Sequence, residues 1–485
     1  MLLIFSRASL ELLASGRVVF GIFSVLVLMA LLTVPSVLLR RRGRPAAALS
    51  WLLALFALPG LGVLAWWAFG RTHLERKKRR RARKHLAFAQ ARAVPGLQRG
   101  TIFDRQMPRR AQGECVFPSR GNHMRLLLDG PDAYAAMEEA IASARSTVHI
   151  AMYIWQNDTT GRRIRDLLVE RARAGVQVRV LVDGFGSSGF VRRLGKPLLD
   201  AGARVAVFLP SRFTPFDSPR TNFVNHRKIL VVDGAVAFTG GMNVGDEYAL
   251  RWRDAMVRLE GPAVLDLQHV FLDDWYFATD ELVEEDSEQD PELLLARAAP
   301  SPPHTVELAI IASGPDSEAW IHDAYFLSLT QAKERIWIAT PYFIPGPAIL
   351  AALRTAAGRG VDVRIVVPAE SDVALVTWAS RSFYRMLLHA GVRIFEYGGT
   401  MLHGKALITD HLIGSVGTAN IDSRSFRLSF EVGCFFASRE PNERLAAWIE
   451  SLCDSATEVT LEAIARKPMV QKLAESVAHL GSPLL

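Results

Sequence analysis

Two long apolar runs open the chain, and neither contains a charged residue. They extend from Val18 to Leu39 and from Ala46 to Phe69. Each is long enough for a helix that crosses a hydrocarbon core about 30 Å thick. Pro59-Gly60, in the middle of the second run, predicts a kink of the kind that membrane helices tolerate. The pattern therefore predicts two transmembrane helices, at about 18–39 and 46–69.

Basic clusters follow both runs and bear on their orientation. Four arginines separate the runs (Arg40, Arg41, Arg42 and Arg44), and the strongly basic stretch 71–84 follows the second. Two spans place both chain ends on one side, and the larger cluster predicts that this side is cytoplasmic, although the four arginines favour the reverse. A signal peptide and a buried hairpin of a soluble core are the alternatives. The stretch 71–84 fits anionic headgroups beside a span more simply than nucleic acid.

From about residue 120 onward, strand-like and helix-like patterns alternate, and the series occurs twice. The first half has an apolar run at 148–155, an amphipathic stretch at 164–174 and a second apolar run at 176–182. The second half repeats this order at 336–339, 348–357 and 361–367. Such units predict an α/β fold with a mixed, mainly parallel sheet flanked by helices. We expect two duplicated lobes related by pseudo-twofold symmetry.

The expected domain boundaries follow from these patterns. Residues 1–70 form a membrane anchor, and 71–120 form a basic linker. The first lobe covers 121–280, an acidic, proline-bearing linker covers 281–303, and the second lobe covers 304–485.

Composition adds two constraints to this picture. The 485 residues carry a formal net charge of +8, with arginine far outnumbering lysine, which suits either nucleic acid or anionic lipid. The three cysteines (Cys115, Cys434 and Cys453) form neither a CxxC pair nor a zinc-binding spacing, which predicts reduced core thiols.

One polar motif occurs in both halves in the same register. The copies are separated by 177 positions, and each has a histidine, a lysine, an aspartate, an asparagine and a second acid. The first copy comprises His226, Lys228, Asp233, Asn243 and Asp254, and the second comprises His403, Lys405, Asp410, Asn420 and Glu431. A single HxKxxxxD match is a modest signal, whereas two copies in register are a strong one.

The residue types in this motif indicate phosphate chemistry. The apolar residues after Lys228 predict that HxK lies on one face of a buried strand, where two polar groups need a charged ligand to justify their burial. Lysine supplies a point charge and an asparagine amide a neutral donor, so two docked halves would surround one phosphate. One imidazole then attacks phosphorus to form a phosphohistidine, and the other transfers protons to and from the alcohols.

The acids have a second role in this scheme. A carboxylate hydrogen-bonded to the far ring nitrogen fixes the tautomer of a histidine, and Asp254 and Glu431 are placed to do so. The sequence leaves open which acid serves which histidine. Asp233 and Asp410 belong to the candidate catalytic motif, but their place at strand ends favours a role in holding turns.

The doubled HxKxxxxD motif with its downstream asparagine resembles the phospholipase D superfamily. Further stretches are similar to bacterial cardiolipin synthases, among them Tyr153-Ile154-Trp155, Pro341 to Pro345, Asp246-Glu247-Tyr248 and Asn420 to Phe426. The resemblance runs from about Gly121 to the C-terminus. Val224, Thr418 and Ser429 depart from the commoner family residues, which puts the substrate fit in doubt but spares the catalytic set.

The resemblance implies specific roles. His226 would be the nucleophile and His403 the general acid and base, with Lys228, Lys405, Asn243 and Asn420 holding phosphate and no metal or cofactor. Phosphatidylglycerol would donate its phosphatidyl group to a second phosphatidylglycerol, at the inner membrane of a bacterium, with an anionic membrane as partner and no nucleic acid expected. A hydrolase of phospholipid, or a nuclease, is the alternative, as is a scaffold with a decayed site. The oligomeric state and the preferred acceptor stay open.

Two other segments have competing interpretations. Asp183-Gly184-Phe185-Gly186 follows a predicted strand and could bind phosphate, but it lacks the spacing of a known phosphate loop, so a strand-end turn is favoured. The stretch 211–220, rich in Pro, Phe and Arg, is either the lip of a lipid tunnel or an ordinary long loop.

Overall fold

The computed structural model describes residues 16–41, 45–70, 118–209, 223–281, 283 and 306–482. Contacts divide the chain into a small unit that contains the N-terminal helices and a large unit that contains both halves of the repeat. The expected linkers at 71–120 and 281–303 fall almost entirely outside the described residues, and the stretch 211–220 does so completely.

The first apolar run forms α2 (Gly16–Arg40), as predicted. Among the described residues it is the one helix long and apolar enough to cross a membrane. Large apolar side chains on it are exposed, including Phe20 at 71% and Leu32 at 73%. A helix that is apolar on all sides and exposed in this way is typical of a membrane-embedded segment.

The second run does not form the single spanning helix that was predicted. It forms α3 (Pro45–Ala57), α4 (Pro59–Ala65) and a π-helical turn, η1 (Trp66–Gly70). The break falls at Leu58, because Pro59 has no backbone N–H and restricts the residue before it to non-helical conformations. The proline that was expected to kink one helix therefore ends it, and a second helix begins.

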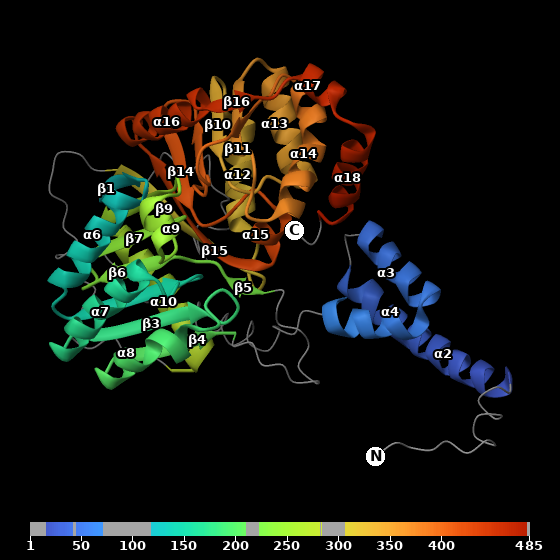
Figure 1. Ribbon diagram of the computed structural model, residues 1–485, viewed down its shortest axis with the longest axis horizontal. Helices are drawn as coiled ribbons and strands as arrows, with labels where there is room; N and C mark the ends of the chain where they lie inside the picture. The colour runs from blue at the N-terminus through green and yellow to red at the C-terminus, as the bar shows by residue number, and fades with distance from the viewer. Residues whose placement is uncertain are drawn as a thin grey trace. The chain divides into compact units, whose positions relative to one another are not determined.

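The large unit consists of two lobes built on one continuous sheet (Figure 1). The first lobe contains β1 (Ser119–Leu128), α6 (Gly130–Ser143), β2 (Thr147–Met152), α7 (Thr159–Arg173), β3 (Gln177–Asp183), η4 (Val191–Gly195), α8 (Lys196–Asp200), β4 (Arg204–Phe208), β5 (Val224–Asn225), β6 (Ile229–Val232), β7 (Val236–Gly240), α9 (Asp246–Leu250), β8 (Ala255–Glu260) and α10 (Ala263–Thr279).

The second lobe begins after the 281–303 segment. It contains β9 (Val306–Ser313), α12 (Trp320–Gln331), β10 (Arg335–Ala339), α13 (Pro347–Gly358), β11 (Asp362–Pro368), α14 (Ala374–His389), β12 (Arg393–Tyr397), β13 (Ala406–Thr409), β14 (Ile413–Gly417), α15 (Ser423–Arg427), β15 (Ser429–Ala437), α16 (Arg439–Asp454), β16 (Ala456–Glu458), α17 (Leu461–Arg466) and α18 (Met469–Leu480).

The strand order confirms the predicted duplication. From the centre outward, the first lobe runs β1-β8-β7-β6-β2-β3-β4 and the second runs β9-β15-β14-β13-β10-β11-β12, with β1 and β9 paired antiparallel at the join. Each of these strands thus has a counterpart at the same distance from the β1–β9 pair, and β16 extends the second lobe beyond β12. This arrangement is the pseudo-twofold symmetry that the repeated sequence predicts.

The mixed α/β architecture is confirmed, but the expected excess of parallel pairs is not found. In the described residues, parallel ladders are confined to β2–β3–β4, β10–β11–β12 and the short β5–β15 pair. Helices α7 and α13 supply the crossovers that parallel neighbours need. The strand pairs β6–β7 and β13–β14 are instead joined by short turns, which make them antiparallel.

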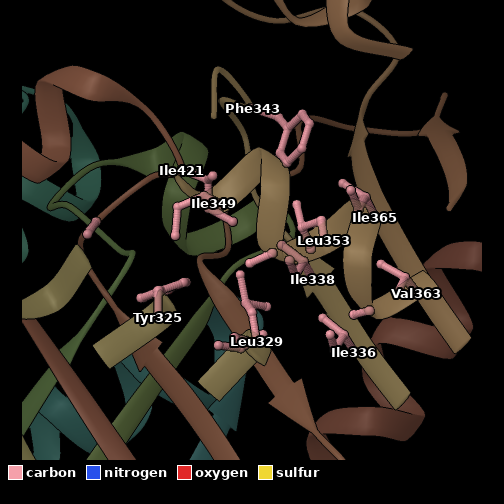
Figure 2. Packing of buried hydrophobic residues seen from close by; sticks show 14 of the residues in the cluster. Tyr325, Leu329, Ile336, Ile338, Phe343, Ile349, Leu353, Val363, Ile365 and Ile421 are labelled. Carbon is pink, nitrogen blue, oxygen red and sulfur yellow. The ribbon is translucent and has the colours of Figure 1, made fainter. Parts of the chain in front are cut away.

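Each lobe has its own apolar core between the sheet and its helices. Figure 2 shows the core of the second lobe, where Ile336 and Ile338 of β10 and Ile365 of β11 meet Leu353 of α13 and Leu329 of α12. All of these except Leu329 are apolar positions that the sequence pattern assigned to strands or helices. The motif histidines and their acids lie outside both cores, where the two lobes meet.

Candidate functional site

Both HxK segments lie just before a strand, and not within one as predicted. His226 and Lys228 lie between β5 and β6, and His403 and Lys405 lie before β13. The histidine and lysine of the second segment nevertheless share a side, since Lys405 Nζ lies 3.0 Å from Nε2 of His403. The reason for the displacement is that each segment first pairs with the opposite lobe and only then joins the sheet of its own lobe.

The pairing that displaces the two segments has the same pattern in both lobes. In the first, β5 runs beside the start of β15, and the backbone N–H of His226 donates to the carbonyl of Phe430 at 2.9 Å. In the second, Leu402 bridges Arg253, and the N–H of His403 donates to the carbonyl of Arg253 at 2.8 Å. Each histidine is therefore anchored on the residue that precedes the acid of the other lobe.

As a result, each histidine contacts the acid of the opposite lobe. Nδ1 of His226 lies 3.1 Å from Oε2 of Glu431, and Nδ1 of His403 lies 2.7 Å from Oδ2 of Asp254. Both carboxylates are fully buried. The sequence left open which acid contacts which histidine. In the structure Glu431 contacts His226, and Asp254 contacts His403.

Thr418 adds a second partner to the His226–Glu431 pair. Its backbone carbonyl lies 3.1 Å from Nδ1 of His226, and its hydroxyl donates to Oε2 of Glu431. A carbonyl oxygen only accepts hydrogen bonds, so Nδ1 must carry the proton. The tautomer leaves the lone pair of Nε2 free, which is the form that a nucleophilic imidazole needs. The sequence gave Thr418 no role beyond marking a departure from the family pattern.

The two lysines are buried beside the histidines. Lys228 Nζ donates to the carbonyl of His226 at 2.8 Å, and Lys405 Nζ lies 3.0 Å from Nε2 of His403. Their exposed fractions are 0% and 1%. Burying an ammonium group without a partner of full charge is costly, and the backbone carbonyls offset only part of this cost.

Burial lowers the pKa values of the histidines and lysines, and charge crowding adds an effect that crosses the lobe boundary. Burial lowers the pKa of Lys405 to about 8, and burial with the charge of Lys405 lowers that of Lys228. Burial, Lys228 and Lys405 hold the pKa of His226 well below its usual value, and burial and Lys405 lower that of His403 to about 4. Since Lys405 acts on groups of both lobes, the four basic side chains share one site. Such a cluster favours an anion.

The pKa of the Glu431 carboxyl group is raised, in contrast to the lowered pKa values of the histidines and lysines. Burial raises its pKa to about 7, although Lys228 and Thr418 partly counteract this. The group therefore titrates near neutral pH.

The two asparagines are not equivalent. Oδ1 of Asn243 accepts from the N–H of Ile154 at 3.0 Å, which leaves its buried Nδ2 without a hydrogen-bond partner in the described residues. The amide of Asn420 instead hydrogen-bonds the Asp422 carboxyl and so lowers its pKa, against a larger rise from burial to about 6. The buried Oδ1 of Asn420 is unpaired in the described part of the chain. The amide of Asn243 lies beside the Tyr248 hydroxyl, whose pKa it lowers against a larger rise from burial, and the amide of Asn420 faces Asp422.

Asp233 and Asp410 lie in turns, apart from the histidines. Asp233 accepts from the N–H groups of Ser146 at 2.7 Å and Thr147 at 2.8 Å, and Asp410 accepts from that of Glu334 at 2.8 Å. Both have positive φ values, 52° and 50°, in the turns after β6 and β13. These contacts support the role of holding turns that their strand-end positions favoured.

Aromatic rings that the sequence did not assign to the site flank both histidines. The ring of Tyr153 meets that of His226 edge to face at 4.8 Å, and Lys228 lies 5.3 Å from the same tyrosine. Tyr248 and Trp252 both lie 5.3 Å from His403. These rings restrict the motion of the imidazoles. The only sequence signal for them was the family-like stretches that contain Tyr153 and Tyr248.

A buried ion pair supports the first histidine segment. Arg227 Nη1 contacts Asp274 of α10 at 2.6 Å, and Arg227 Nε donates to the backbone carbonyl of Glu431 at 3.0 Å. The equivalent position in the second lobe is Gly404, where an added Cβ would lie 2.6 Å from the Trp448 ring. The HRK and HGK forms of the motif thus reflect different packing behind the same catalytic pair.

The candidate phosphate loop at Asp183 is a strand-end turn, as favoured. Its Oδ1 accepts from the N–H groups of Phe185 at 2.8 Å and Gly186 at 2.9 Å, and its Oδ2 accepts from that of Asn225 at 2.7 Å. The amides that would bind phosphate are occupied. Asp183 instead positions the segment that leads to His226.

Among the described residues there is no group of three or more His, Cys, Asp or Glu side chains that could hold a metal ion. Cys434 and Cys453 are free and buried, as predicted for core thiols, whereas Cys115 lies outside the described residues.

Comparison with known proteins gives the same picture. A family model described as "Cardiolipin synthase, PLD-like domain" matches residues 137–275 and 326–453, one segment in each lobe. A second, described as "Phospholipase D-nuclease N-terminal", matches residues 22–71. The two lobe segments together cover more than half of the chain.

Curated relatives match over nearly the whole length. The chain is 34% identical to a cardiolipin synthase of Alkalihalophilus pseudofirmus, with 96% of this chain and 94% of the relative covered. It is 36% identical to that of Geobacillus kaustophilus, with 96% and 94% covered. It is 35% identical to the major cardiolipin synthase of Bacillus subtilis, with 93% and 96% covered.

A solved structure, phosphatidylserine synthase of Haemophilus influenzae, shares the fold. It has a TM-score of 0.56 and 17% identity, and the match covers 75% of this chain and 95% of the other. With the paired motif, the crossed histidine–acid pairs and the full-length relatives in place, the chain belongs to the cardiolipin synthase family of phospholipase D-like proteins.

Proposed function

We propose that this protein joins two phosphatidylglycerol molecules into cardiolipin and releases glycerol. The observation that carries the proposal is the pair of imidazoles, each held by a buried carboxylate of the opposite lobe beside a buried lysine. Two imidazoles with different partners can act in turn on one phosphorus atom.

The chemistry proceeds in two displacements. Nε2 of His226 attacks phosphorus, and the bond from phosphorus to the glycerol oxygen breaks while His403 donates a proton to that oxygen. A hydroxyl of the second phosphatidylglycerol then loses its proton to His403 and attacks phosphorus. The P–N bond breaks, and neutral His226 is regenerated with cardiolipin as product.

The partners of the two histidines support this division of roles. Thr418 fixes a proton on Nδ1 of His226, so that Nε2 is available for attack. His403 has the shorter contact with a carboxylate, 2.7 Å to Asp254, which favours its protonated form once a phosphate is bound. The nucleophile is therefore assigned to His226, and the general acid and base to His403.

Phosphate binding also changes the protonation of the site. The pKa values of both lysines and both histidines are lowered by burial and mutual repulsion. A phosphodiester carries a negative charge, which raises these pKa values again and makes a protonated His403 accessible near neutral pH. In this proposal Lys228, Lys405 and the amide of Asn243 bind its oxygens, which the burial of both lysines beside the histidines supports.

The reaction is tested with purified full-length protein in detergent and phosphatidylglycerol as the only lipid. Cardiolipin and free glycerol should appear in equal amounts, and the His403→Ala variant should form neither. Phosphatidic acid as the only lipid product would instead identify a hydrolase that uses water as acceptor. Cleavage of single-stranded DNA under the same conditions would identify a nuclease.

The domain arrangement that we propose has an anchor at 1–70, a basic linker at 71–120, lobes at 121–280 and 304–485, and an acidic linker at 281–303. It is supported by the helices of the small unit and, to within a few residues, by the elements that begin and end each lobe, which are β1 and α10 in the first and β9 and α18 in the second. The apolar helix α2 and the family match at 22–71 support attachment to a bacterial cell membrane.

The helices of the small unit support one membrane crossing in place of two. α2 has 25 residues, or roughly 38 Å at about 1.5 Å per residue, whereas the 13 residues of α3 extend only about 20 Å. A hydrocarbon core is about 30 Å thick. Thus α2 is long enough to cross, and α3 is not.

Contacts with α2 show how far the second run reaches and where it returns. A Cβ on Gly60 would lie 3.3 Å from Leu26, in the middle of α2, whereas Trp66 Nε1 donates to Ser36 Oγ at 3.2 Å and Arg41 donates to the carbonyl of Gly70 at 3.4 Å. The run therefore starts and ends at the Arg41 end of α2. As a re-entrant hairpin it would leave the four arginines and the 71–84 cluster on one side, which removes the conflict in the positive-inside rule and favours a cytoplasmic catalytic body.

A further inference from the structure

Helix α18 (Met469–Leu480) is amphipathic, but its apolar side faces away from the protein. It packs on α14, beside which it lies in Figure 1, through small and polar residues. Ala478 is 2% exposed and Glu475 is 6% exposed. The His479 ring meets that of Phe383 at 4.9 Å, and its Nδ1 lies 3.0 Å from Ser382 Oγ.

The outward side of α18 is a continuous apolar stripe. Five side chains that are between 59% and 80% exposed make up this "α18 stripe": Met469, Val470, Leu473, Val477 and Leu480. At about 100° per residue, these positions fall within roughly 100° of the helix circumference. A helix that packs by its own hydrophobicity would turn this side inward, so the stripe is made for another partner.

The charges around the stripe identify the chemistry of that partner. Glu475, the acidic residue of α18, points inward and pairs with Lys467 at 2.7 Å. Lys472 lies next to Leu473 of the stripe, with its ammonium held by the carbonyl of Ala465 at 2.8 Å, and the exposed Arg466 ends the preceding helix, α17. An apolar stripe with basic neighbours and no exposed carboxylate on its helix complements the interface of an anionic bilayer.

We propose that the α18 stripe inserts into the headgroup region of an anionic phospholipid bilayer and forms a membrane contact separate from α2. The helix would lie in the plane of the interface, with its stripe in the acyl-chain boundary and its basic residues at the phosphates. α14 exposes Trp378 and Met386, both 44% exposed, and so adds apolar surface on the element that supports α18. If the proposed function holds, this contact brings the catalytic body to the surface from which its substrate is drawn.

The contact is tested without reference to activity, on full-length protein reconstituted in vesicles of phosphatidylglycerol and phosphatidylcholine. An environment-sensitive fluorophore is attached at Leu473→Cys, with Cys115 replaced by serine, since Cys434 and Cys453 are buried. Leu199→Cys is the matched control, because it is an exposed leucine, 49% exposed, on helix α8 of the other lobe. Nitroxide groups on the lipid acyl chains and aqueous iodide serve as the two quenchers.

The proposal predicts that nitroxide lipids quench the probe at 473 and iodide does not, with the reverse at 199. Equal access of iodide to both probes would overturn it. If the probe at 473 is protected from both quenchers, and the protection grows with the protein-to-lipid ratio, the proposal is overturned and the stripe is instead a contact between copies of this chain. Protection from both at every ratio would overturn it in favour of an intramolecular cover.

A second measurement separates this proposal from the proposed function. Leu473→Glu should lower activity on phosphatidylglycerol in vesicles roughly tenfold, since it removes one of five apolar contacts and adds a charge, while activity on a soluble short-chain analogue stays unchanged. Leu199→Glu should leave both activities as they are. An equal loss by Leu473→Glu on both substrates would contradict the membrane contact, whereas an unmodified chain inactive on both would contradict only the proposed function.

Discussion

Nδ1 of His226 lies 3.1 Å from Oε2 of Glu431, although 205 positions separate the two residues in the chain. The same exchange joins His403 to Asp254 across 149 positions. Neither lobe therefore contains a complete histidine–acid pair, and the site exists only where the lobes are docked. We make four predictions from the structure of the two lobes and one from the N-terminal helices.

The two acids should affect different steps. Glu431→Gln removes the charge that stabilises a phosphorylated His226, and we expect phosphohistidine formation to slow by roughly 10²–10⁴-fold. Asp254→Asn should instead slow proton transfer by His403 and so affect release of glycerol and capture of the acceptor. Rapid-quench measurements with phosphorus-labelled phosphatidylglycerol check this. The same kinetic defect in both variants would contradict the division of roles.

The nucleophile can be identified with an activated substrate. A phosphatidyl ester of p-nitrophenol needs no proton on its leaving group, so His403→Ala should still form the phosphohistidine and should accumulate it. His226→Ala should release no nitrophenol at all above the uncatalysed rate. Acid-labile, base-stable protein-bound phosphate is the measurement, and its appearance in His226→Ala would reverse the assignment.

The pH profile should have limbs set by Lys405 and Glu431. Burial lowers the pKa of Lys405 to about 8, so its charge is lost as the pH rises through that value and KM for phosphatidylglycerol should increase. Burial raises the pKa of Glu431 to about 7, so protonation below that pH should lower kcat. In Lys405→Arg the alkaline limb should move upward, since a guanidinium stays charged. An unmoved alkaline limb would exclude Lys405 as its origin.

The buried Arg227–Asp274 pair should matter for stability. Arg227→Ala leaves a buried carboxylate without its counter-ion, and we expect a loss of about 3–5 kcal/mol in the free energy of unfolding. Lys196→Ala, which breaks the exposed pair with Asp200, should cost less than about 1 kcal/mol. Thermal unfolding in detergent compares the two, and equal shifts would show that burial of the pair is unimportant.

The re-entrant hairpin predicts the side on which residue 43 lies. A membrane-impermeant maleimide should not label Gly43→Cys in intact cells, but should label it after permeabilisation. Ser6→Cys, on the other side of α2, should react in intact cells. Two full spans with a cytoplasmic catalytic body require the opposite pattern at both positions, so the experiment distinguishes the two topologies.

The sequence by itself determined the repeated elements and the residue types of the site. Alternating apolar patterns located β3 and α13, and the equal spacing of His226 and His403 from their asparagines and acids identified the reactive groups. These features are local, because a short stretch of sequence is enough to recognise the period of a strand or helix and the residues of a motif.

Only the tertiary structure decided which groups meet. The contacts of Glu431 with His226 and of Asp254 with His403, and the carbonyl of Thr418 on His226, depend on atoms brought together from distant segments. The same holds for the return of the second apolar run to Arg41 and for the outward face of α18. Hydropathy records how apolar a segment is, but the direction in which its side chains point is set by what the rest of the chain packs against it.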